Sequence, residues 1–223
     1  EGYSYPDKIK PEGPFGEWMG YYAIPQTDEP YLDVKGLYFR DDPIVLGIPP
    51  QRPPYDADKC RQYIRSAELY QRLRDFGITG LKNAWCHMVG ACRLLLIASI
   101  EQQYNGHARQ VAHAIAGSFA ARVLSRYIVV VDDDIDITDL DEVVWAMLTR
   151  SDPATSIDII QRTAAQPDPR LTPEDRAYGK LLGSQAIIDA TKPFEWKDRF
   201  PREVQPDAEY RKISRQKFGY IFK

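Results

Sequence analysis

In residues 127–136, Tyr127-Ile128-Val129-Val130-Val131-Asp132-Asp133-Asp134-Ile135-Asp136, an apolar run passes directly into a cluster of acids. Consecutive apolar residues of this kind are typical of a strand that is covered on both faces. Clustered carboxylates suit a hard cation, but the run lacks the twelve-residue calcium loop with its late glutamate. Turn formation and helix capping explain the acids without a metal, and we favour that interpretation.

A helix is predicted directly after the acids. Thr138 or Asp139 is placed to begin it, and the pattern continues to Arg150. Glu142 follows Asp139 at the spacing of a capping box. A last strand is predicted near residues 156–160, and the proline-containing residues 166–174 are predicted to be a loop.

Strands and a helix are also predicted upstream of the run. Residues 78–88 and 92–100 have strand patterns, and residues 107–124 have a helical pattern. The apolar face of that helix is formed by residues at a spacing of four: Val111, Ile115, Phe119 and Val123. The sequence therefore predicts a small α/β sheet layered with helices.

The first quarter of the chain has a different character. Residues 1–55 are rich in proline, and strand-like pieces occur only at 31–40 and, less clearly, at 18–24, which indicates a β-rich, loop-heavy unit. A helical pattern follows over residues 57–76, and Gly77 stands where a C-terminal cap belongs. The predicted divisions are residues 1–56, a linking helix at 57–77, an α/β domain at 78–192 and a tail at 193–223.

Composition excludes several classes of protein. The 223 residues carry a net charge of -3 without a basic stripe, so nucleic acid is not an expected partner. The apolar runs are too short to span a bilayer, and we expect a cytoplasmic protein. Cys60, Cys86 and Cys92 have neither disulfide nor zinc-ligand spacing. A Cys86–His87 dyad is disfavoured, because neighbours in a strand point to opposite faces.

A glycine- and proline-rich segment presents two acids near the N-terminus: Pro11-Glu12-Gly13-Pro14-Phe15-Gly16-Glu17-Trp18-Met19-Gly20-Tyr21-Tyr22. The glycines permit unusual backbone conformations and the prolines fix φ, so Glu12 and Glu17 are expected on a stiff loop. Such a loop is either a structural turn with acids or a loop shaped for a ligand.

This segment resembles the signature of the UbiD-like decarboxylases, and five further blocks of the family occur in the same order: Arg40–Ile44, Tyr104–Ala108, Val129–Asp136, Val144–Pro153 and Ile187–Thr191. The resemblance implies a prenylated-FMN-dependent enzyme with a divalent metal and K⁺, which removes or adds CO₂ on an aromatic or α,β-unsaturated acid. It also implies an α/β sheet domain that follows part of a β-rich split-barrel cofactor domain. The chain as a whole is then of the α+β class.

The resemblance assigns roles to individual residues. Glu12 is implied as a ligand of the Mn²⁺ or Mg²⁺ ion that ties the cofactor phosphate to the protein. Glu17 is expected to brace the loop by accepting backbone N–H bonds. Asp58, with Asp56 beside it, is implied as the acid that protonates the substrate carbon after CO₂ leaves. Without the resemblance, Asp56 is equally well an N-cap and Asp58 a first-turn acid.

The sequence departs from the family pattern at two places. Residues 42–55 contain no glutamate to pair with the proton donor, which weakens the assignment of Asp58. Gln185 stands where many members have a lysine that reaches the cofactor, and an amide can hydrogen-bond but cannot offset charge. Lys180 or Lys192 is the candidate substitute.

Two hypotheses follow. In the first, the chain is the C-terminal portion of a (de)carboxylase, cut in mid-strand at Glu1 and inactive alone. In the second, it is an assembly module or a small subunit that completes an active site with a separate N-terminal chain. The second rests on the apolar side chains of residues 208–223, which favour a homo-oligomer.

Overall fold

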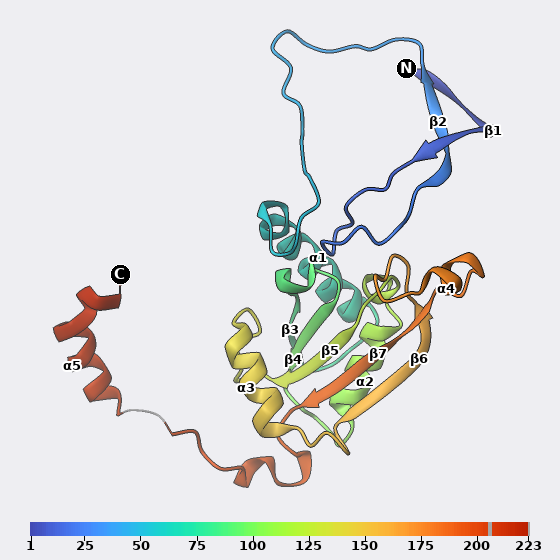
Figure 1. Ribbon diagram of the computed structural model, residues 1–223. Coiled ribbons are helices and arrows are strands. Elements are labelled where there is room, and N and C mark those ends of the chain that lie inside the picture. Colours follow the sequence, from blue (N-terminus) through green and yellow to red (C-terminus); the bar gives the residue numbers. More distant parts are fainter. Residues whose placement is uncertain (205–206, 223) are drawn as a thin grey trace.

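The computed structural model describes residues 1–204 and 207–222 (Figure 1). A five-stranded sheet forms its centre, with the strands in the order β3-β4-β5-β7-β6. These strands are β3 (Leu81–Cys86), β4 (Leu95–Ile100), β5 (Tyr127–Asp132), β6 (Ile157–Ala164) and β7 (Leu182–Ala190). The central three are parallel, and both edge strands are antiparallel to their neighbours.

Helices cover both faces of this sheet. Helices α1 (Asp56–Asp75) and α2 (His107–Ala116) pack on one face, and α3 (Leu140–Arg150) packs on the other (Figure 1). In β5, Ile128 and Val130 belong to the first core, whereas Val129 and Val131 belong to the second. The continuous apolar run is therefore explained, because successive side chains enter opposite cores.

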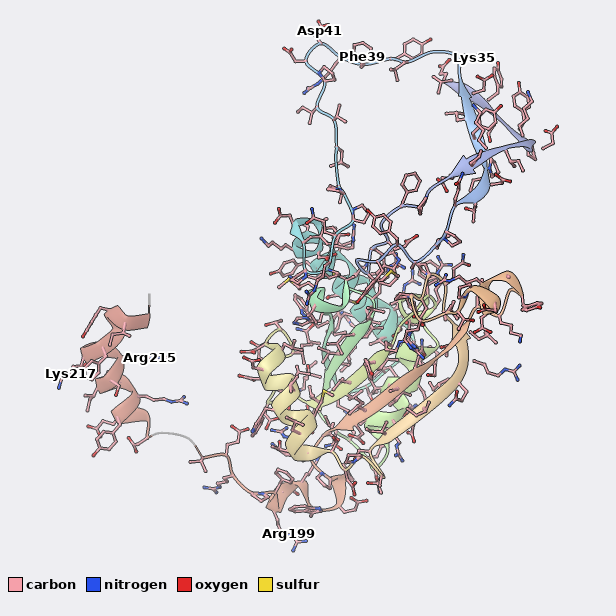
Figure 2. The ribbon with its side chains drawn as sticks, in the orientation of Figure 1. Lys35, Phe39, Asp41, Arg199, Arg215 and Lys217 are labelled. Atoms are coloured by element: carbon pink, nitrogen blue, oxygen red, sulfur yellow. The ribbon has the colours of Figure 1, made fainter. Side chains whose placement is uncertain are left out.

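The shorter helices lie in the connections and at the C-terminal end. They are η1 (Met88–Gly90), η2 (Phe119–Ala121), α4 (Pro173–Ala177), η3 (Phe194–Arg199), α5 (Ala208–Phe218) and η4 (Gly219–Phe222). Figure 1 shows α5 apart from the sheet and its helices, and Figure 2 shows Arg215 and Lys217 on this separate helix. Lys223, the last residue of the predicted tail, lies outside the described residues.

The N-terminal residues form a two-stranded antiparallel hairpin of β1 (Gly2–Glu12) and β2 (Thr27–Val34). It stands away from the sheet and is joined to it through residues 13–26 and 35–55 (Figure 1). The first of these segments is anchored, because Met19 and Ala23 are buried against Leu124 and Ala165. The two segments also touch each other, since a Cβ at Gly20 (φ +89°) would lie 2.6 Å from the Cα of Arg52.

Several predicted elements are confirmed. Strand β5, helix α1 and helix α3 occur where the sequence predicted them, and Gly77 has the positive φ, +86°, of a C-terminal cap. Strands β3 and β4 are present but shorter than predicted, and β6 extends past residue 160. The α/β class with helices layered on a sheet is confirmed.

Other predictions are wrong. Residues 18–24 form a turn and not a strand, closed by a hydrogen bond from the Gly20 N–H to the Glu17 carbonyl. The helix predicted over 107–124 ends at Ala116, so Val123 is not on its apolar face. Strand β7 was not predicted, and β2 begins and ends earlier than residues 31–40. Helix α4 begins inside the predicted loop at 166–174.

The capping of α3 also differs from its prediction. Asp139 is the N-cap, but its side chain accepts from the Asp141 N–H, while Glu142 accepts from the N–H of Asp136 at 2.8 Å. Glu142 thus closes the preceding turn and does not form a capping box with Asp139. In residues 1–204 and 207–222, no helix is both long and apolar enough to cross a membrane.

Candidate functional site

The start of α1 holds the two acids that were predicted to act together. Asp58 is completely buried, and its carboxylate accepts hydrogen bonds from the Tyr55 N–H at 3.4 Å and from Arg61 Nη1 at 3.2 Å. The Cys92 thiol donates a hydrogen bond to the backbone carbonyl of Asp58 at 3.6 Å. Asp58 is therefore the first-turn acid that was the alternative to catalysis, and its carboxylate also accepts from the N–H of the N-cap residue Tyr55.

Asp56 has the opposite environment. Its side chain is 99% exposed, and it forms an ion pair with Lys59 at 3.1 Å. Tyr55, and not Asp56, is the N-cap residue of the helix. The two carboxylates lie on the same first turn but in different surroundings, one enclosed by protein and the other open to solvent.

Arg61 connects the start of the helix into one unit. Its guanidinium donates to the Tyr55 hydroxyl at 3.0 Å as well as to Asp58. The bond to Tyr55 raises the pKa of Arg61, burial opposes that shift, and the negative charge of Asp58 adds to it. An arginine held in this way keeps its charge and ties the Tyr55 hydroxyl to the Asp58 carboxylate.

The predicted cofactor and metal residues lie in three separate places. Glu12 is exposed at the end of β1, opposite Thr27 of β2. Glu17 contributes its backbone N–H and carbonyl to the turn at 2.8 Å, so the main chain closes this loop. Gln185 is buried in β7, where its amide donates to the Ala121 carbonyl at 3.0 Å.

The lysines considered as substitutes for the family lysine have other contacts. Lys192 forms an ion pair with Asp134, and Lys180 Nζ lies 5.7 Å from the centre of the Tyr178 ring. Asp132 accepts from the Gln102 side-chain amide at 2.7 Å and from the Lys192 N–H at 2.7 Å. Arg150, whose side chain is 1% exposed, bonds both Asp132 and Asp134.

This network explains the acidic run at the end of β5. Burial raises the pKa of Asp132, whereas for Asp134 the bonds from Arg150 and Lys192 outweigh burial and lower the pKa. Asp136 accepts from the N–H and hydroxyl of Thr138 at 2.9 and 2.7 Å. In the described ranges, no three His, Cys, Asp or Glu side chains are grouped so as to hold a metal ion.

The cysteines and His87 form no nucleophilic pair. His87 Nδ1 accepts from the Val89 N–H at 3.1 Å, and burial lowers the pKa of His87. Burial raises the pKa of Cys86 to about 12 and that of Cys92 to about 11, so both thiols stay protonated at neutral pH. The disfavoured Cys86–His87 dyad is accordingly not formed.

A cleft of about 590 Å³ lies beside α1, and no binding site was predicted there from the sequence. One wall is a face of α1, and the other walls come from η2 and from residues 48 and 93. Four arginines line it: Arg61, Arg65, Arg93 and Arg122. The spacing of Arg61 and Arg65 on one helix face was the available signal, but Arg93 and Arg122 join them only through the fold.

Two family models, both of the same carboxy-lyase, match successive parts of the chain. Residues 1–53 match the family model of the 3-octaprenyl-4-hydroxybenzoate carboxy-lyase Rift-related domain, and residues 60–190 match the model of the C-terminal domain of the same carboxy-lyase. A protein of Archaeoglobus fulgidus described as uncharacterized is 32% identical in an alignment 220 residues long, which covers 94% of this chain and 42% of that protein.

Solved structures give the same result. The UbiD-class enzyme HmfF from Pelotomaculum thermopropionicum, in complex with FMN, has a TM-score of 0.75 and 29% identity, covering 94% of this chain and 44% of that chain. The closed form of vanillic acid decarboxylase from Sedimentibacter hydroxybenzoicus has a TM-score of 0.74 and 26% identity, covering 100% of this chain and 45% of that chain. The chain thus spans less than half the length of these relatives.

Proposed function

Because the chain belongs to the UbiD family of carboxy-lyases, we propose that it is the C-terminal portion of a non-oxidative (de)carboxylase that acts on an aromatic or α,β-unsaturated acid. The observation that carries this proposal is the order of two family domains in one chain, at residues 1–53 and 60–190. Vanillic acid decarboxylase, which shares the fold over the whole chain, supports an aromatic substrate. The reaction would release CO₂, or consume it in the reverse direction.

Prenylated FMN, with Mn²⁺ or Mg²⁺ and K⁺, is the proposed cofactor set. It is supported by a dimeric HmfF structure in complex with prFMN, which is 27% identical to this chain. Hard cations take several oxygen ligands, and Glu12, the ligand that the resemblance implies, is not part of a group of three His, Cys, Asp or Glu side chains among the described residues. The residues present therefore do not fit a complete metal site, and the remaining ligands of the proposed site would come from elsewhere.

We propose a division of labour between the two acids of α1. Loss of CO₂ leaves an electron pair on the substrate carbon, and an acid must supply a proton to it. Asp58 is enclosed and bonded to Arg61, so it cannot approach a substrate without breaking the start of the helix. Asp56 is exposed and its neighbour Ala57 lines the arginine-lined cleft, so we propose Asp56 as the donor and Asp58 as a positioning residue.

The proposal is tested in two steps. The purified 223-residue chain, supplied with prenylated FMN, Mn²⁺, K⁺ and a panel of aromatic acids, is expected to show no turnover, and any turnover contradicts that expectation. In an active assembly that contains this chain, Asp56→Asn is expected to lower kcat about 100-fold or more. The matched control is Asp75→Asn, an acid in the last turn of α1, which should leave kcat unchanged.

Asp58→Asn separates positioning from catalysis. If Asp58 only positions the helix start, the variant should lower the melting temperature and leave the pH profile of kcat in place. A loss of activity at Asp58 alone, with Asp56→Asn fully active, would return the donor role to Asp58.

A second proposed function is assembly. In α5 and η4 the side chains of Tyr210, Ile213, Tyr220 and Ile221 are exposed, and Figure 1 shows no other element of the chain beside them. A terminal helix with this much exposed apolar surface favours a homo-oligomer or a partner subunit. This role is compatible with the first, because a subunit that completes an active site must also bind its partner.

A further inference from the structure

Three of the arginines in the cleft beside α1 have no carboxylate partner among the described residues. Arg61 is bonded to Asp58, but no ion pair reaches Arg65, Arg93 or Arg122 in the ranges 1–204 and 207–222. Glu68 is the one acid in the lining, and its carboxylate is bonded to Arg72 at 2.8 Å. The cleft therefore has an excess of positive charge that the chain itself does not neutralise.

The guanidinium groups are close enough to affect one another. Burial lowers the pKa of Arg93, and the positive charges of Arg65, Arg61 and Arg122 lower it further. Like charges in a partly buried cleft repel, which costs stability unless something compensates. Protein clefts lined by one sign of charge concentrate ions of the opposite sign.

Aromatic rings hold two of these arginines in place. The Arg122 guanidinium lies 3.8 Å from the centre of the Phe119 ring, and the Arg93 guanidinium lies 5.1 Å from that of Trp18. Such stacking fixes the plane of a guanidinium and leaves its edge N–H groups available. Arg65 lies in helix α1, whereas Arg93 and Arg122 lie in turns, where these ring contacts position them.

The remaining lining is apolar. Ile48, Ile64, Ala120 and Phe119 lie among the arginines, and the cleft volume of about 590 Å³ is within the range of small-molecule sites. A bare inorganic ion would use only the charged part of this lining. An anion attached to a flat apolar body would contact both parts.

From this arrangement we infer that the cleft is a binding site for a small organic oxyanion, in which Arg65, Arg93 and Arg122 hold a carboxylate or phosphate group and Ile64 and Phe119 contact an aromatic or other planar apolar body. Guanidinium groups bind both oxyanions through paired N–H donors. Charge and shape thus define the ligand as a small oxyanion on a planar apolar body. Experiment distinguishes a carboxylate from a phosphate.

The test is calorimetric titration of the complete 223-residue chain, at low ionic strength, with benzoate, phenyl phosphate and neutral benzamide. We expect saturable one-to-one binding of at least one anion, weakening as NaCl is added, and no binding of benzamide. Tighter binding of benzoate identifies a carboxylate site, and tighter binding of phenyl phosphate identifies a phosphate site. Absence of binding by both anions, or equal binding of benzamide, overturns the inference.

Charge-neutralising variants locate the site. Arg65→Gln and Arg122→Gln are each expected to lower the affinity roughly tenfold or more, the usual effect of losing a charged hydrogen bond. Arg74→Gln is the matched control, because Arg74 lies on the same helix but outside the cleft lining. An equal loss of affinity in the control shows general charge attraction and overturns the proposal.

Thermal melting keeps the result interpretable. Removing an uncompensated arginine relieves repulsion between like charges, so both variants should melt at or above the melting temperature of the parent chain. If Arg65→Gln fails to fold, Arg122→Gln still tests the site, because Arg122 is exposed. The inference does not require the proposed decarboxylase activity. The titration involves no cofactor or turnover, so its failure would leave that proposal intact, and an inactive enzyme would leave the titration valid.

Discussion

Arg150 shows how a single buried charge organises one end of the sheet. Its side chain reaches Asp132 at the end of β5, Asp134 in the following turn, and Glu203 beyond β7. A buried arginine is costly without partners, and here carboxylates from separate segments surround it. The acidic cluster is therefore better understood as the counter-charge of Arg150 and Lys192 than as a ligand set.

This network makes stability depend on pH through Asp134. Because its pKa in the folded chain lies below the ordinary 3.8, Asp134 contributes stability that is present above that value and is lost as pH falls through the folded pKa. We expect Asp134→Asn to lower the free energy of unfolding by about 1–2 kcal/mol at pH 7, less than for a fully buried pair because Asp134 is about one-third exposed.

Urea denaturation at pH 7 and pH 3 checks this expectation. The difference between the parent and Asp134→Asn should shrink at pH 3. Asp133→Asn is the matched control, since that neighbour is exposed and 3.9 Å from Lys82, and it should change stability by less than about 0.5 kcal/mol. A difference that is the same at both pH values would mean that Asp134 acts through packing and not through its charge.

The three cysteines should differ in reactivity. Cys86 and Cys92 are buried and have raised pKa values, about 12 and about 11, while Cys60 is exposed. At pH 7.5 a thiol reagent such as dithionitrobenzoate should modify Cys60 rapidly and the other two only after denaturation. Cys60→Ser should abolish the fast phase. Rapid modification of Cys92 in the native chain would show that the contact between its thiol and the Asp58 carbonyl opens readily.

Among the helices and strands, those with a strong local signal were predictable and those made by pairing were not. Strand β5 contains the apolar run Ile128 to Val131, and α1 has a helical pattern followed by Gly77, so each was found. Strand β7 begins Leu182-Gly183-Ser184-Gln185, and its place in the sheet comes from pairing with β5 and β6 on its two sides. No local pattern contains that information.

The site was predictable to a similar degree. The sequence drew attention to Glu12, Glu17, Asp56 and Asp58, but not to which acid is buried. The exposure of Asp56 and the enclosure of Asp58 depend on Arg61 and on Cys92, which arrives from the connection before β4. The arginine cleft likewise needs Arg93 and Arg122 from separate connections. Such groupings are properties of tertiary structure.

The C-terminal cap of α1 can be tested directly. Gly77 has φ of +86°, where a side chain is strained, although a Cβ there would meet open space. Gly77→Ala is therefore expected to lower the free energy of unfolding by about 1 kcal/mol through backbone strain alone. Gly47→Ala is the control, because Gly47 also has open space around its Cα but no positive φ.

That control should be neutral or slightly stabilising. Unfolding curves in urea give both values. If Gly77→Ala were as stable as Gly47→Ala, the helix would have to end without the left-handed residue that the structure places there.

For the whole molecule, the exposed C-terminal helix predicts association. Light scattering on the purified chain in solution should show a dimer or a larger closed assembly. Ile213→Asp should shift the chain toward the monomer, whereas Ser214→Asp, which adds the same charge on the neighbouring position of α5, should have a smaller effect. A chain that remains monomeric at high concentration would contradict the proposed homo-oligomer.

The strand order has a consequence for how the chain folds. The central pairing of β5 with β7 is parallel and joins Tyr127 to Ala186, so it forms only after α3, β6 and α4 have been passed. Pairing between distant parts of a chain loses the entropy of loop closure before the stabilising contacts form, and this slows folding. Hairpin β1–β2 and helix α1 can form early because their contacts are mostly local, and we expect closure of β5 on β7 to be the slow step in completing the sheet.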